Sequence, residues 1–215
     1  MIETYKILSG NYDTNEYLYV TSVCKSCFFQ LRQLRLIRSC LTTDAAKTLI
    51  HAFVSSRLDY CNSLLVGAAD CVVRKLQGVQ NAAARMITGT RKFDHVTPIL
   101  RELHWLPVAN RIQYKIAMLV KQCLRGLAPP YLAELCRPVV HLTECRHLRS
   151  AASGKLDVQR TATAIGRRNF AVSGPETWNS LPAELRLSTL STATFARLLK
   201  AHLFVTLNDM CLQRV

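Results

Sequence analysis

The stretch that decides the fold reads LQGVQNAAARMITG and covers residues 76–89. A helix over residues 74–88 separates an apolar stripe from a polar, cationic one, because positions three and four apart share a face. The apolar stripe consists of Leu76, Val79, Ala83 and Met86. The opposite stripe consists of Arg74, Gln77, Asn81 and Arg85. Gly89 is expected to end the helix, since glycine readily adopts the left-handed conformation found at helix C-termini.

Two more helices are expected before this one. The helical period of residues 21–39 has an inward seam made of Val20, Val23, Cys24, Cys27, Leu31 and Leu34. Thr42 or Thr43 can cap the next helix, which extends to about Leu65. The apolar positions expected there are Leu49, Ile50, Phe53 and Tyr60. Residues 21–90 therefore predict three helices that close a small bundle.

Residues 91–207 predict a second helical segment, so the expected fold class is mainly α. A helix over residues 108–125 should follow Pro107, with Ile112, Ile116, Leu119 and Cys123 inside and Lys121 and Arg125 behind. A last helix over about residues 191–207 should turn inward Phe195, Leu198, Leu199, His202 and Leu203. Between the two helices, residues 137–168 form an irregular basic segment with at most a short strand or hairpin near Leu156 and Val158.

The ends of the chain lack this helical pattern. Residues 1–20 are polar, and Gly10, Asn11, Asp13 and Asn15 favour turns, so these residues are expected to form a leader. Residues 208–215 are expected to be a terminus. No signal peptide is visible, and no uncharged apolar stretch is long enough to cross a bilayer. We expect a soluble, intracellular protein with no membrane partner, in the nucleus or the cytoplasm.

The cysteines indicate buried free thiols in a reducing compartment, because most of the nine lie inside apolar helical patterns. Cys24 and Cys27 have a spacing that can begin a zinc site, but no second pair matches them. The looser cluster of Cys136, His141, Cys145 and His147 raises the same question. A closed zinc site needs four ligands, so thiols are the favoured interpretation at both places. We expect no metal and no cofactor.

Charge is the unusual feature of the composition. Lys and Arg number 28 against 14 Asp and Glu, which gives a net charge of +14. Such an excess attracts polyanions and predicts salt-sensitive binding to nucleic acid. The alternative is a basic protein that has no specific polyanion partner.

Four short stretches carry a resemblance to a known family: SRLDYCNSLL (residues 56–65), VQNAAAR (79–85), TGTRK (88–92) and HWLPV (104–108). They resemble the carboxy-terminal part of reverse transcriptases from non-LTR, jockey-like mobile elements. FAVSGPETWNSLP (170–182) is similar to the tail of the same proteins, except that Arg167 stands where an acidic residue is common. The similarity covers roughly residues 21–204.

The resemblance implies a piece of a polymerase that follows the catalytic palm. Residues 21–90 then form a thumb-like bundle, and residues 91–207 form a carboxy-terminal tail. In that family an adjacent Asp-Asp pair in the palm holds the metal ions of nucleotidyl transfer, whereas this sequence has no two adjacent acidic residues. We therefore expect a non-catalytic fragment with no catalytic residues and no small-molecule substrate.

A thumb holds the primer-template duplex, and the resemblance implies that role here. The expected partner is RNA or an RNA–DNA hybrid, together with an upstream or separate palm. The cations expected to follow the phosphate backbone are Lys25, Arg32, Arg35, Arg74, Arg85, Arg91 and Lys92. Trp105, Tyr114, Phe93 and Trp178 are weaker candidates for stacking on bases, because aromatic residues at helical spacing usually belong to a core.

A second class of function stays open. The chain can instead be a helical protein-interaction module or a retrotransposon relic without function. An interaction module predicts binding through exposed apolar faces, especially residues 195–203, and an affinity that does not depend on salt.

Overall fold

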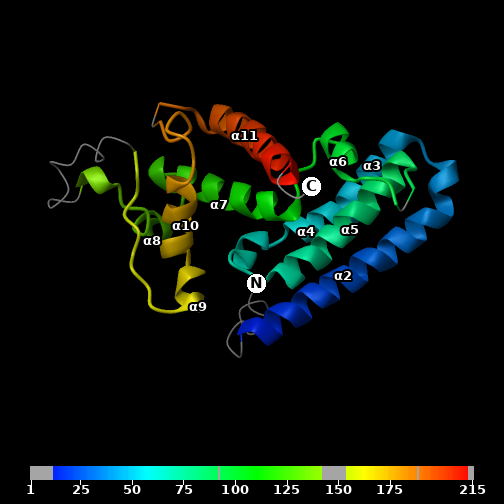
Figure 1. The fold of residues 1–215 in the computed structure, drawn as a ribbon, viewed down its shortest axis with the longest axis horizontal. Helices are drawn as coiled ribbons and strands as arrows, with labels where there is room; N and C mark the ends of the chain where they lie inside the picture. The colour runs from blue at the N-terminus through cyan, green and yellow to red at the C-terminus, as the bar shows by residue number, and fades with distance from the viewer. Residues whose placement is uncertain (1–11, 92, 142–153, 188, 213–215) are drawn as a thin grey trace. The chain divides into compact units, whose positions relative to one another are not determined.

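The computed structural model describes residues 12–91, 93–141, 154–187 and 189–212, with side chains only for the part of these between Asn15 and Val205. The chain divides into two compact units, Met1–Arg111 and Ile112–Val215. The division falls one turn into helix α7 (Val108–Leu124). Helices make up nearly all the regular structure in the described ranges, which confirms the mainly α fold class (Figure 1).

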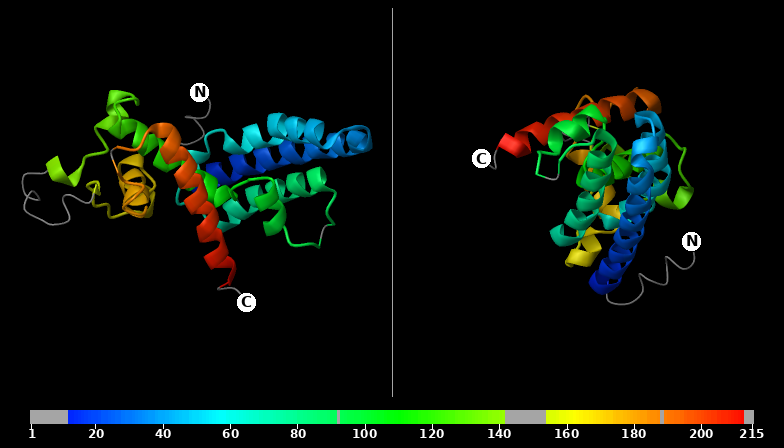
Figure 2. Two further views of the ribbon diagram at one scale, coloured as in Figure 1. Left: turned by 90° about the horizontal axis from the view of Figure 1, so that it is seen from above. Right: turned by 90° about the vertical axis from the view of Figure 1, so that its right-hand side faces the viewer.

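The first unit is a bundle of three helical segments. Its elements are α2 (Tyr12–Ile37), η1 (Arg38–Cys40), α3 (Thr43–Ile50), η2 (His51–Ser55), α4 (Ser56–Asp59), η3 (Asn62–Leu65), α5 (Asp70–Thr88) and α6 (Thr97–Glu102). Helices α2 and α5 lie side by side (Figure 1; Figure 2). They run parallel, because Tyr17 of α2 meets Lys75 near the start of α5, while Arg38 reaches Met86 near its end.

Helix α5 confirms the expected stripe. Its predicted apolar residues are all buried, namely Leu76, Val79, Ala83 and Met86. The helix begins four residues earlier than expected, at Asp70. It ends at Gly89, whose φ of +70° is the left-handed conformation that glycine adopts without strain.

Helix α2 buries the expected seam, made of Val20, Cys24, Cys27, Leu31 and Leu34, with Val23 half-buried. The expectation of turns before residue 21 is wrong from Tyr12 onward, because the helix already begins there. Packing against α5 explains the difference. Lys75 Nζ lies 3.4 Å from the ring centroid of Tyr17, and Glu16 is buried one turn before Val20. Such tertiary contacts override a local preference for turns.

The second helical segment differs from its predicted apolar pattern. Thr42 caps α3 as expected, since its Oγ1 accepts a hydrogen bond from Ala45 N. A π-helical turn, η2, then shifts the register, so the buried positions are Ala46, Ile50, Val54 and Leu58. Phe53 and Tyr60 are exposed, and Leu49 is only half-buried. The regular helix ends at Asp59 rather than near Leu65.

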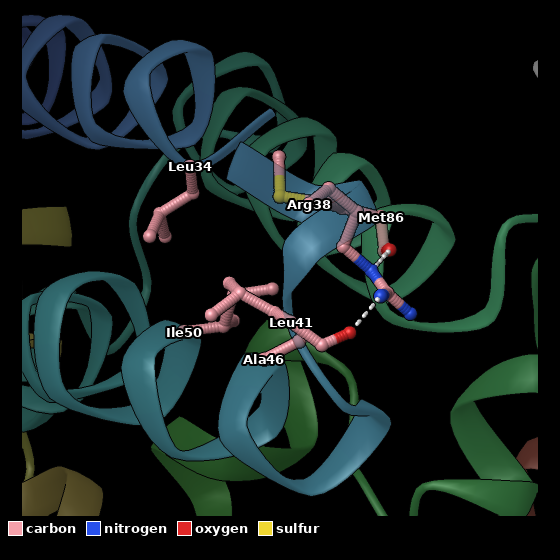
Figure 3. A pocket seen from close by; sticks show the side chains of 6 residues that line it. All are labelled: Leu34, Arg38, Leu41, Ala46, Ile50 and Met86. Atoms are coloured by element: carbon pink, nitrogen blue, oxygen red, sulfur yellow. Dashed lines mark hydrogen bonds between the residues drawn. The ribbon is translucent and has the colours of Figure 1, made fainter. Parts of the chain in front are cut away.

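Arg38 joins the ends of these segments. Its guanidinium donates to the carbonyl oxygens of Met86 and Ile87, in the last turn of α5, and to that of Leu41. These carbonyls carry the negative end of the α5 dipole, so the charge of Arg38 stabilises the carboxy end of α5. The aliphatic part of Arg38 closes an apolar recess lined by Leu34, Leu41, Ala46, Ile50 and Met86 (Figure 3). The recess has no room for a water molecule.

The second unit contains the rest of α7 and the helices that follow. These are α8 (Pro130–Ala133), η4 (Val139–His141), α9 (Ala164–Arg167), α10 (Phe170–Asn179) and α11 (Thr192–Leu212). The inner side of α7 is buried at Ile112, Ile116 and Cys123, as expected, while Leu119 is half-buried. Gly174 of α10 permits a close approach to Val120 of α7, because a Cβ there would lie 3.3 Å from the valine side chain.

Two predictions about side-chain direction in this unit are wrong. Lys121 was predicted on the outer side of α7, but it is only 1% exposed. Its Nζ donates a hydrogen bond to the Leu187 carbonyl 3.0 Å away, and its aliphatic stem covers apolar surface. Burial lowers the pKa of Lys121, and nearby Arg125 lowers it further. On α11, Phe195, Leu199 and Leu203 are buried as expected, but Leu198 is exposed, since it lies beside the buried stripe.

The WNSLP stretch (residues 178–182) holds part of the irregular segment (residues 137–168) through hydrogen bonds. Trp178 Nε1 donates to the Gly154 carbonyl, and the Asn179 side chain exchanges two hydrogen bonds of 2.8 Å with the backbone of Leu156. Leu156 in turn forms an isolated antiparallel bridge with Pro138. The prediction that this segment contains at most a short strand is thus confirmed for its described residues.

Candidate nucleic-acid interface

Residues from three of the motif stretches form a cluster with Arg111, which we call the hub: Asp59, Gln80, Trp105, Leu106 and Arg111. Gln80 is 1% exposed, and its Nε2 donates to the Leu106 carbonyl at 2.8 Å. Arg111 Nε donates to the same carbonyl, while its Nη1 contacts both carboxylate oxygens of Asp59 at 2.9 and 3.0 Å. The hub therefore connects three separate segments of sequence.

Two residues that the sequence placed on the outer, polar stripe of α5 also form hydrogen bonds inside the first unit. Gln77 Oε1 accepts a hydrogen bond from Val108 N at the start of α7, and Gln77 Nε2 donates to Asn81 Oδ1. Both side chains are half-buried. Gln77 and Asn81 thus hold the turn before α7, which reduces the outward polar stripe of α5 largely to its arginines.

The arginines of α5 and of the following loop form the first cationic surface, which we call the α5 face: Arg74, Arg85 and Arg91. Arg74 and Arg91 are exposed, and Arg85 is half-buried. Arg85 Nη2 donates to the Asp94 carbonyl, and its buried Nε has no hydrogen-bond partner. Arg74 and Arg85 are about three turns apart, or roughly 16 Å along the helix axis. The seventh candidate, Lys92, lies outside the described residues.

Lys25, Arg32 and Arg35 form the second cationic surface, which we call the α2 face. All three are exposed. Lys25 and Arg32 lie on the side of α2 turned away from its buried seam, and Arg35 lies on the flank of the seam. The α5 face likewise lies opposite the buried stripe of α5, and these two buried sides contact each other. The structure therefore divides the candidate cations between two surfaces.

None of these six described candidates forms an ion pair with a carboxylate in the described part of the chain. The ion pairs there join Lys47 with Asp44 and Arg111 with Asp59. A carboxylate does lie at the α5 face, where Asp94 Oδ2 accepts a hydrogen bond from Arg91 N, but it forms no ion pair with the arginine side chains. Cations that are not paired in this way can attract a polyanion.

The candidate stacking residues separate by burial. Trp105 and Trp178 are buried, so neither ring is available to a base. Tyr114 is half-buried, and Phe93 is 92% exposed in the basic loop. Sequence reasoning missed two other rings, Phe28 and Phe29, which are exposed between the cations of the α2 face. Their spacing from Lys25 and Arg32, at i, i+3, i+4 and i+7, was the available signal.

The cysteines whose side chains the structure describes are free thiols. Cys24 and Cys27 lie in the buried seam, and burial raises the pKa of Cys27 to about 11. Cys136 shares a hydrogen bond with Cys123, and burial raises the pKa of Cys136 to about 12. Cys145, His147 and the side chain of His141 lie outside the described residues. Within the described ranges, no three His, Cys, Asp or Glu residues converge to hold a metal ion.

Among the described residues, no helix is both long enough and apolar enough to span a bilayer.

Comparisons with protein-family models, curated proteins and solved structures give no match to this chain.

Proposed function

We propose that the chain binds nucleic acid through the α2 and α5 faces and does not itself catalyse polymerisation. The observation that carries the proposal is a set of five exposed cations that form no ion pair with a carboxylate in the described part of the chain: Lys25, Arg32, Arg35, Arg74 and Arg91. Cations placed in this way attract phosphates and fix a partner's position, but they read no base sequence.

The class of protein proposed is the thumb and tail part of a non-LTR retrotransposon RNA-directed DNA polymerase. Two observations support it. The stretches that resemble that family contribute Asp59, Gln80, Trp105 and Leu106 to the hub, which is consistent with a role in folding rather than in catalysis. The sequence also lacks the adjacent acidic pair of the palm. A palm on an upstream or separate chain is the proposed protein partner.

The rival interaction module loses its preferred surface, because Phe195, Leu199 and Leu203 are buried inside the second unit. The largest group of exposed apolar side chains on one helix of the first unit lies on α2 instead, where Phe28 and Phe29 lie between Lys25 and Arg32.

Charge reversal tests the proposal. The variant R74E/R91E is expected to weaken binding to a labelled RNA–DNA hybrid more than the control R197E/K200E, which changes the net charge equally on exposed positions of α11. Arg85 is left intact, because its hydrogen bond to Asp94 makes it partly structural. Circular dichroism checks that all variants keep their helices. Equal losses in the two variants, or no binding by the wild type at low salt, contradict the proposal.

A further inference from the structure

We propose that the α2 face binds unpaired nucleotides, whose bases stack on Phe28 and Phe29 while Lys25 and Arg32 hold the flanking phosphates. This inference rests on the proposed function and specifies which form of nucleic acid each face takes.

The four side chains share one side of α2. They occupy positions i, i+3, i+4 and i+7, which are neighbours on a helix surface. Phe28 is 41% exposed and Phe29 is 54% exposed, and both cations are exposed. The ring pair is therefore bracketed by a positive charge about one turn away on either side.

Neither ring makes a ring–ring or cation–ring contact among the described residues. The contacts found there join His51 with Trp105, Trp178 with Phe195, and three cations with Tyr17, Trp105 and Phe195. Two adjacent phenylalanines left in water are costly, and stacking on a base removes part of that cost.

The positive charge of the α2 face indicates which kind of partner it binds. The sequence has no acidic residue between Glu16 and Asp44, so no carboxylate of α2 opposes Lys25, Arg32 and Arg35. A second copy of this chain would bring the same cations to the contact and would be repelled. A single strand supplies both requirements, since it offers phosphates for the cations and accessible base faces for the rings.

The α5 face lacks this combination. No large apolar side chain of α5 itself is exposed among the described residues. The exposed ring near its arginines is the single Phe93, in the loop after Arg91, so this face has no adjacent pair of rings between two cations. Such a surface suits the backbone of a duplex, whose bases are stacked inside and cannot reach a ring. The two faces should therefore differ in the strand form that they prefer.

The test compares two probes on the full chain by fluorescence anisotropy: a labelled oligothymidylate of about 15 nucleotides and a blunt RNA–DNA hybrid. The variant F28L/F29L keeps the apolar character and removes both rings. It is expected to bind the oligothymidylate about tenfold more weakly or worse, because base–aromatic stacking contributes on this scale. Its affinity for the hybrid and its salt dependence should not change. F28Y/F29Y, which keeps the rings, should bind like the wild type.

A direct readout comes from F29W, because stacking on a base should quench the emission of this tryptophan when oligothymidylate is added. The matched control is L36A, which removes an aliphatic side chain that is 77% exposed on the same side of α2 and should leave both affinities unchanged. Circular dichroism confirms that each variant stays helical.

Two results overturn the inference while leaving the proposed function intact. One is hybrid binding with no oligothymidylate binding, or with equal effects of F28L/F29L on both probes. The other is a loss in L36A as large as in F28L/F29L, which would indicate an apolar contact of the kind made by a partner helix. Failure of both probes to bind at low salt removes the proposed function itself.

Discussion

The hub and the two cationic faces use charged and polar residues in opposite ways. In the hub, Arg111 is satisfied by Asp59 and by the Leu106 carbonyl, so its charge stabilises the fold. On the faces, Lys25, Arg32 and Arg74 have no carboxylate partner. The comparison teaches that a charged or polar residue does not by itself mark a binding surface: the hub residues connect segments, while exposed cations outside the hub remain available to a partner.

The largest effect should come from removing the aromatic core of the hub. W105A is expected to lower the free energy of unfolding by about 3–5 kcal/mol, because it leaves a cavity beside His51 and Arg111. Urea denaturation measures this loss, and W105F should lose less. Hybrid affinity measured well below the melting temperature should not change. A stable W105A protein with weakened binding would instead assign Trp105 to the surface.

Alkaline pH gives the next effect. The folded pKa of Cys27 is about 11, against 9.0 for an ordinary thiol, because burial disfavours the thiolate. The contribution of the protonated Cys27 thiol to the free energy of unfolding is fully present below pH 9. It is lost as the pH rises toward 11, because the unfolded state releases this proton first. The loss is at most about 3 kcal/mol.

Urea denaturation at a series of pH values tests this linkage. C27A should show a shallower alkaline decline than the wild type, while C40A, which alters an exposed thiol, should keep the decline. Parallel declines in all three proteins would contradict the burial of Cys27 in the seam of α2.

The ion pair of the hub should show an asymmetric, smaller effect. R111A is expected to cost about 2 kcal/mol and D59A about 1 kcal/mol, because Arg111 also serves the Leu106 carbonyl whereas the Asp59 side chain is 45% exposed. A double-mutant cycle by denaturation measures the coupling between them. Equal costs for the two variants would show that the Leu106 contact contributes nothing.

Periodicity predicted the parts of the fold that depend on one helix at a time. The stripe of α5 and the seam of α2 repeat every three or four residues, so their burial could be read directly from the sequence. Phe53 and Tyr60 could not be placed, because the π-helical turn η2 changes the register between them and α3.

Long-range contacts account for the other differences. Lys121 was expected outside because lysine is usually exposed, but its partner is the Leu187 carbonyl, far away in the sequence. Gln77 was expected outside because it lies on the polar stripe of α5, but its Oε1 accepts a hydrogen bond from Val108 N. Of the candidate site, the exposure of Lys25, Arg32, Arg35 and Arg74 agrees with the amphipathic pattern of their helices, and Arg91 is exposed in the loop after α5. Their division between two faces depends on how α2 and α5 pack.

The most direct measurement is the affinity of the wild-type chain for a labelled RNA–DNA hybrid at increasing salt. If the unpaired cations contact phosphates, log K should fall linearly with log salt concentration, with a slope steeper than about −3, because each neutralised phosphate contributes about −0.9. R74E/R91E should make that slope shallower while W105F leaves it unchanged. A flat salt response, or the same slope in R74E/R91E as in the wild type, would contradict the assignment of these faces to nucleic acid.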